Sequence, residues 1–164
     1  MVPEPLTFAG NASDGYELRR DEALIGRIAS WTAAAGARAE AGTDVWLLTV
    51  DGDREALAAT WQVVARDEAG EIAAHYVHGS MRGGPVRTHD GLRGSLRRQL
   101  GLSVEWRFRL SDAAVRMRSG TESAGGRLDL EYVAGSADIP VLVLLQTCWA
   151  VMNEEGIEPA RAPS

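Results

Sequence analysis

Arginine is the residue type in this chain with the most evident capacity for chemistry, and it is unevenly distributed. The chain has no lysine, so all 17 basic residues are arginine. Residues 81–118 contain nine arginines and three acidic residues, although the whole chain carries a net charge of −6. A guanidinium group presents fixed N–H donors that bind phosphate or carboxylate bidentately. This segment therefore predicts contact with an anionic head group, or with the protein's own acidic residues.

Seven of these arginines form the candidate anion site. Arg107 and Arg109 alternate along one predicted strand, and Arg116 and Arg118 along the next, so each pair points to one face. Two acidic residues alternate in the same way on the following strand, and opposite charges often pair across strands. For these four arginines, the alternative to anion binding is therefore pairing with the protein's own acidic residues. The stronger anion candidates have no such acidic neighbours and are Arg93, Arg97 and Arg98.

Residue types suited to catalysis or metal binding are present, but their spacing forms no motif. His75 and His78 are three residues apart on a predicted strand, so they point to opposite faces and cannot hold one metal ion together, and His89 is distant in sequence. Ser80 fits neither the G-x-S-x-G nor the P-loop pattern. Cys148 lies in an apolar segment, where a thiol is usually an inert hydrophobic group. We therefore expect no catalytic residues, no metal site and no cofactor.

Most of the chain is predicted to form antiparallel strands, because apolar and polar residues alternate along it. In SVEWRFRL, for example, Val104, Trp106, Phe108 and Leu110 fall on one face and charged residues on the other. Residues 91–101 fit either a strand or a short amphipathic helix. Turn sequences such as DGD, HDG and SAGG separate the segments. The same alternation appears in residues 6–9, 16–19, 23–31, 44–50, 57–66, 71–79, 114–119 and 127–133.

The uncharged residues 139–153 predict a helix that is buried on all sides. These 15 residues would span about 22 Å as a helix. A helix that crosses a bilayer needs ~20 apolar residues, so we expect no transmembrane segment. Pro140 suits a first helical turn, Asp138 can cap it and Gly156 can end it. Apolar side chains cover every direction around the axis, which requires burial all round. We predict that a closed sheet surrounds a helix at about 138–155.

The order of these elements resembles the tubby C-terminal domain superfamily, which also includes the phospholipid scramblases and the LURP-one-related proteins. The segment YELRRDEALIGRIASW resembles its early strand pair, WQVVARDEAGEIAAHYVHG its mid-barrel hairpin, VRTHDGLRGSL with VEWRFRL a later turn and strand, and DIPVLVLLQTCWAVMNEEG its central helix. The resemblance implies a mainly β fold, a closed antiparallel β-barrel of about twelve strands around a hydrophobic C-terminal helix. The strand segments found in the sequence are one or two short of twelve. Residues 1–164 would form a single domain, with 157–164 as a disordered tail.

The resemblance implies little about function, and a lumen filled by the helix argues against catalysis. Tubby domains bind phosphoinositides through basic residues outside the barrel, and scramblases are associated with phospholipid and calcium. Their motifs have no counterpart here, so no individual residue is carried over. We expect a non-catalytic module that contacts an anionic lipid head group or a protein partner through the barrel exterior. The single cysteine is typical of a cytoplasmic protein, here one that could lie peripherally at a membrane, and the negative net charge argues against nucleic acid.

Two other function classes stay open at this point. A small β-barrel enzyme or ligand carrier would hold its substrate in a lumen lined by Trp61, Trp106 and Phe108, with the helix docked outside. A structural or assembly protein would pair with another copy through an uncovered edge strand. The position of residues 139–153, inside or outside the barrel, separates the enzyme or carrier from the binding module.

Overall fold

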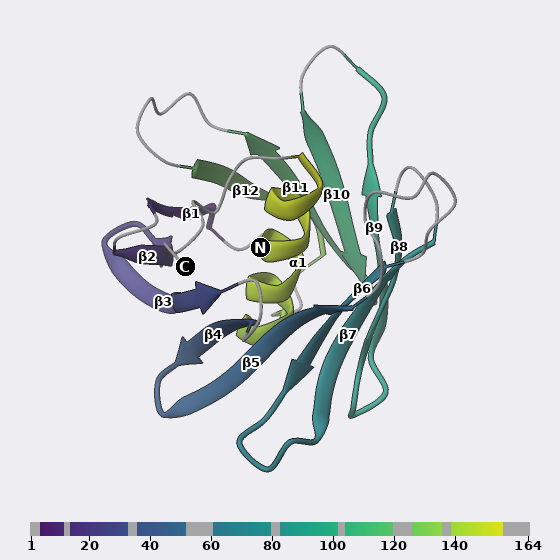
Figure 1. Cartoon of the computed structure of the whole chain (residues 1–164). Helices are drawn as coiled ribbons and strands as arrows, with labels where there is room; N and C mark the ends of the chain where they lie inside the picture. Colours follow the sequence, from purple (N-terminus) through teal and green to yellow (C-terminus); the bar gives the residue numbers. More distant parts are fainter. Residues whose placement is uncertain are drawn as a thin grey trace.

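A closed sheet of twelve antiparallel strands surrounds a single helix in the computed structural model of this chain (Figure 1). The structure describes residues 4–11, 14–32, 36–51, 61–79, 83–101, 104–119, 126–135 and 139–155. The elements are β1 (Leu6–Asn11), β2 (Gly15–Arg20), β3 (Ala23–Thr32), β4 (Gly36–Ala41), β5 (Asp44–Asp51), β6 (Trp61–Arg66), β7 (Ile72–His78), β8 (Gly83–Thr88), β9 (Arg93–Arg98), β10 (Glu105–Leu110), β11 (Ala113–Ser119), β12 (Gly126–Ala134) and α1 (Val141–Glu155). The predicted fold class is confirmed, and the strand count is the full twelve. The predicted tail at 157–164 lies outside the described residues.

Each strand pairs with its neighbours in the sequence, and β1 pairs with β12 to close the sheet. Closure leaves every strand with a partner on both sides. A closed barrel therefore offers no unpaired backbone row for a strand of another chain. The sequence left open an assembly role through an uncovered edge strand. The sheet that the described residues form has no such edge.

Burial along the strands follows the predicted alternation. On β10, Trp106, Phe108 and Leu110 are buried, whereas Arg109 is exposed. The neighbouring strand β9 comes from the segment that fitted either a strand or a helix. Its Leu96 is buried directly opposite Phe108, so the same inner layer continues across both strands. The sequence therefore predicted which face of β10 forms the core, whereas the inner face of β9 is known from its pairing with β10.

Two strands were not recognised in the sequence, β4 and β8. Their sequences, GARAEA and GGPVRT, contain almost no large apolar residue, so the alternation that marks a strand is weak. Small residues suit β4 because α1 lies closest to β3, β4, β6 and β7. Ala37 and Ala39 are fully buried on this wall. On β3, a Cβ added to Gly26 would lie 2.8 Å from Cγ1 of Val141, so the missing side chain allows the helix to approach.

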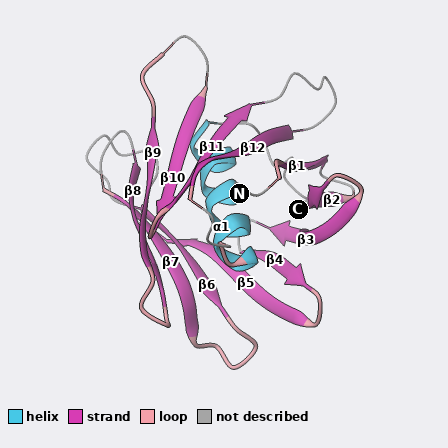
Figure 2. Ribbon diagram, turned by 180° about the vertical axis from the view of Figure 1, so that it is seen from behind, coloured by secondary structure: helices cyan, strands magenta, loops and turns pink. Residues whose placement is uncertain are grey.

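The helix occupies the interior of the barrel (Figures 1 and 2). Every residue from Leu142 to Met152 is buried. Gln146, the polar residue in the middle, donates a hydrogen bond to the Val63 carbonyl of β6 at 2.9 Å. Within the residues that the structure describes, no helix has the length and apolar character needed to cross a bilayer. Residues 139–153 therefore lie inside the barrel, as the lack of a polar face predicted.

The helix begins slightly later than predicted. Its first residue is Val141, because the Pro140 carbonyl accepts hydrogen bonds from the N–H groups of Val143 and Leu144 at 3.0 and 3.2 Å. Pro140 thus precedes the first turn instead of belonging to it. The predicted capping and ending residues, Asp138 and Gly156, lie outside the described residues.

A pair of Leu→Ala substitutions tests the central position of the helix. Leu145 on α1 is fully buried, whereas Leu24 on β3 is 48% exposed. We expect Leu145→Ala to lower the free energy of unfolding by about 2–5 kcal/mol, since it removes buried methyl groups and leaves a cavity. Leu24→Ala should cost no more than about 0.5 kcal/mol. Urea unfolding curves of both variants measure the difference, and equal costs would contradict the helix position.

Candidate anion-binding surface

The outer face of β9 carries a serine with arginines on several sides. Arg93 and Arg97 lie two residues to either side of Ser95, so all three side chains point to the same face. Arg109 on β10 is directly opposite Ser95 in the register. Residues directly opposite on antiparallel strands have Cβ atoms about 4.5–5.5 Å apart. The short Ser95 side chain therefore has three long cationic side chains as close neighbours.

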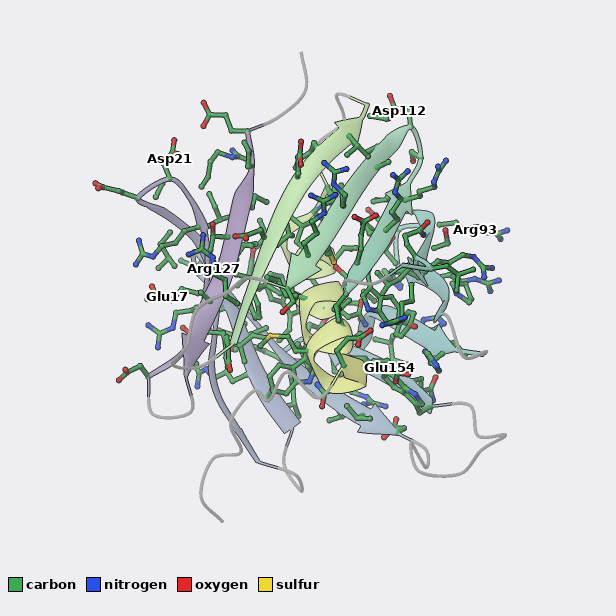
Figure 3. The ribbon with its side chains drawn as sticks, turned by 90° about the horizontal axis from the view of Figure 1, so that it is seen from above. Glu17, Asp21, Arg93, Asp112, Arg127 and Glu154 are labelled. Atoms are coloured by element: carbon green, nitrogen blue, oxygen red, sulfur yellow. The ribbon has the colours of Figure 1, made fainter. Side chains whose placement is uncertain are left out.

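Two further arginines extend this group on the adjoining strands. Arg87 on β8 is directly opposite Arg93, and Arg107 on β10 is directly opposite Arg97. Both lie diagonally from Ser95, a separation of about 7–8 Å that a long side chain can span. The arginine cluster comprises the five residues Arg87, Arg93, Arg97, Arg107 and Arg109. Figure 3 shows Arg93 on the outside of the barrel, away from the helix.

Carboxylates neutralise little of the arginine cluster. Among the residues that the structure describes, the members without any ion pair are Arg87, Arg93, Arg97 and Arg109. Arg107 approaches an acid only distantly, with its Nε 4.0 Å from Oε2 of Glu105, and this Nε is buried without a hydrogen-bond partner. Like charges directly opposite one another destabilise a sheet. An anion held by several of these guanidinium groups would offset that repulsion.

Arg116 and Arg118 point outward on β11, as predicted, but each is paired with an acid. Arg116 Nη2 donates to Glu131 on β12 at 2.5 Å, and Arg118 Nε donates to Glu105 on β10 at 2.8 Å. The hydrogen bond with Glu131 raises the pKa of Arg116. The self-pairing alternative therefore holds for these two arginines. They border the arginine cluster, since Arg107 is directly opposite Arg116.

Arg98 does not join the other candidates, because it lies on the inner face of β9. Its Nε donates to Oε1 of Glu155 at 2.6 Å, and the same oxygen accepts a hydrogen bond from Nε1 of Trp106 at 2.7 Å. Glu155 is the last residue of α1, where the helix dipole disfavours negative charge. Arg98 offsets that charge and holds the end of the helix inside the barrel.

A second group of polar and aromatic side chains lies at the same end of the barrel. The Tyr76 hydroxyl is hydrogen-bonded to Nδ1 of His78 at 2.8 Å, and Trp61 stacks on the His78 ring with centroids 4.8 Å apart. Nε2 of His78 lies 3.7 Å from Oε1 of Glu154. Figure 3 shows Glu154 at the end of the helix. The sequence placed His78 on a face but did not link it to the end of the helix.

The pKa shifts in this interior favour neutral side chains. Burial lowers the pKa of His78, although the Glu154 carboxylate opposes this. Burial, assisted by Glu154, raises the pKa of Tyr76 far above its usual value, and burial does the same for the Cys148 thiol. A tyrosine and a cysteine that keep their protons are poor nucleophiles. The described interior is therefore suited to packing, with the helix held in place by polar contacts at its C-terminal end.

The other residues considered in the sequence do not come together. His75 is on the outside of β7, opposite Arg87, and His89 is exposed in the β8–β9 turn. Ser80 lies outside the described residues. No group of three or more metal-ligating side chains occurs among the residues that the structure describes.

The sequence did not reveal two members of the site, Arg87 and Ser95. Arg87 lies in β8, which the sequence pattern missed, and Ser95 lies in the segment that fitted either a strand or a helix. Alternation within the RGSLRR segment could have placed Ser95 between two arginines. Its proximity to Arg109 depends on the β9–β10 register, which alternation alone does not fix.

Comparisons of this chain with protein-family models, with curated proteins and with solved structures found no match.

The buried His78 predicts a pH dependence of stability. The pKa of His78 in the folded state is below the ordinary value of about 6.5, so the unfolded chain binds more protons at His78 than the folded chain does. The stability that the neutral His78 contributes above pH 6.5 is therefore lost as the pH falls. We expect the free energy of unfolding to decrease between pH 7.5 and 5.5 less steeply in His78→Gln than in the parent protein. Urea unfolding across this range measures both slopes. Identical slopes for the two proteins would contradict the role of His78.

The contacts of Glu155 predict a stability cost when its charge is removed. Its side chain is 12% exposed and accepts two hydrogen bonds, from Arg98 and Trp106. We expect Glu155→Gln to lower the free energy of unfolding by about 1–3 kcal/mol, since Arg98 would lose its counter-charge. Glu131→Gln removes a charge from an exposed pair with Arg116 and should have a much smaller effect. Chemical denaturation of the two variants provides the test, and a larger loss for Glu131→Gln would contradict the assignment.

Proposed function

We propose that this protein is a non-catalytic binding module that contacts anionic phospholipid head groups through the arginine cluster. The observation that carries the proposal is the grouping of five arginines around Ser95 on adjacent strands, four of them without an ion pair among the described residues. Each arginine at the surface of an anionic membrane contributes about 1 kcal/mol of attraction. Five on one face would supply substantial affinity although the chain as a whole is acidic.

The position of the helix supports a binding role for the exterior over a ligand held in the lumen. Trp61, Trp106 and Phe108, the residues expected to line an empty lumen, are buried in one core with α1. An enzyme or carrier of the kind considered from the sequence would need that space for its substrate. A surface site agrees better with this packing.

The resemblance to the tubby superfamily supports the same proposal. Twelve strands followed by a central helix is the order that the resemblance implies. We also propose that the chain belongs to that superfamily, that it is cytoplasmic and that it lies peripherally at a membrane. Vesicle binding tests the peripheral position.

Vesicle sedimentation tests the proposed function. The protein should bind vesicles that contain an anionic phospholipid and should not bind neutral phosphatidylcholine vesicles, and binding should weaken as salt is raised. Arg93→Gln with Arg97→Gln should reduce partitioning about 30-fold, at about 1 kcal/mol for each arginine. Arg98 is left intact because its bond to Glu155 stabilises the fold.

A second double variant serves as the matched control. Arg27→Gln with Arg38→Gln changes the net charge by the same amount on β3 and β4, where both arginines lie near Glu40 at 3.9 and 2.8 Å. Partitioning of this control should fall far less. Equal binding to anionic and neutral vesicles, or no binding to either, would refute the lipid proposal and favour a protein partner for the arginine cluster.

A further inference from the structure

We infer that the barrel docks on an anionic membrane in one orientation, with Leu100 in the headgroup region and the hairpin turns at the opposite end facing water. This inference rests on the proposed lipid-binding function and adds the surface that meets the bilayer. Three observations carry it: the charges of the hairpin turns, the exposure of Leu100 and the direction of β9.

The hairpin turns at one end of the barrel are acidic. The connections β2–β3, β4–β5, β6–β7, β8–β9 and β10–β11 all lie at the end where α1 begins. These five connections contain no arginine, and the acidic residues in them are Asp21, Glu22, Asp67, Glu68, Glu71, Asp90 and Asp112. Figure 3 shows Asp21 and Asp112 at this end, with Glu154 far from it. An anionic membrane would repel this end of the molecule.

Leu100 lies at the other end and is strongly exposed. Among the described residues it is the most exposed large apolar side chain, at 76%, compared with 48% for the next, Leu24. It lies two residues after the end of β9, and Arg97 lies three residues before it. A single exposed leucine needs no explanation by itself. Its position next to the arginine cluster, at the end away from the acidic turns, makes it suited to the membrane interface.

The strand β9 connects these two ends. Its first residue, Arg93, follows the acidic β8–β9 turn, and its last residues lead to Leu100. Arg97 and Arg107 form a row across β9 and β10, where they are directly opposite one another in the half of the barrel nearer to Leu100. A membrane that contacts this row also reaches Leu100. The positive row and the apolar side chain thus define one edge of the molecule as the docking surface.

Site-specific fluorescence can test the orientation, because Cys148 is the only cysteine in the chain and is fully buried. The parent protein should therefore take up little of a thiol-reactive nitrobenzoxadiazole probe. Leu100→Cys places the probe after β9, and His89→Cys places the same probe in the turn before β9. The labelled proteins are mixed with anionic vesicles, with neutral vesicles, and with free inorganic phosphate, while sedimentation measures binding in parallel.

With anionic vesicles, and with no other addition, we expect the fluorescence emission of the probe at position 100 to shift to shorter wavelength. Iodide should then no longer quench this fluorescence. The probe at position 89 should remain in water. Leu100→Asp should weaken partitioning by about tenfold through lost apolar contact and added repulsion, while Leu24→Asp should weaken it much less.

Other outcomes would overturn the inference in distinguishable ways. If the protein sediments with anionic vesicles but the probe at 100 stays in water, or both probes shift alike, the orientation is wrong and lipid binding stands. If the protein does not sediment with anionic vesicles, the proposed function fails and the orientation fails with it. A spectral change with free phosphate that equals the change with vesicles would show a soluble anion site and would also refute membrane docking.

Discussion

The burial of an apolar helix on all of its sides is the constraint on which the rest of this structure depends. A helix without a polar face cannot lie against an open sheet, because half of its surface would meet water. Enclosure requires more strands than the eight whose side chains already fill a barrel. The twelve strands here accommodate α1 unevenly: Gly26 and the alanines of β4 allow a close approach, while Trp106 and Phe108 fill the core from β10, the strand across the barrel. Side chains of both walls and of α1 thus fill the interior together, and the arginine cluster lies on the outer face of the sheet.

Much of this architecture could be predicted from the sequence because large apolar residues report burial directly. Strands such as β10 and β12 carry bulky inward side chains, and the helix shows its burial through the absence of any polar face. The strands β4 and β8 could not be found in the same way, since small residues on the inner face give little contrast with their neighbours. The candidate site was only partly predictable for a related reason. Alternation gives the face of a residue within its strand, but the neighbours of Ser95 are set by pairing between strands, which involves the whole barrel.

Two adjacent residues of β9 illustrate how one strand serves two purposes. Arg97 points outward and belongs to the arginine cluster, while Arg98 points inward and bonds to Glu155. A slip of one residue in the pairing of β9 would exchange them and bury the unpaired charge. The buried Leu96, opposite Phe108, opposes such a slip, because it would have to leave the core. The apolar layer beneath the sheet therefore also keeps the surface charges in place.

The position of α1 in the chain has a consequence for folding. During synthesis all twelve strands leave the ribosome before the helix that fills them, and β1 must wait for β12 before the sheet can close. Pairing between segments so distant in sequence is slow, and the inner faces of the early strands have no final partner in the meantime. The sheet can close only after β12 is made, and α1, which fills it, follows β12 in the chain. The inner faces of the strands therefore stay exposed in a nascent chain until α1 has been synthesised.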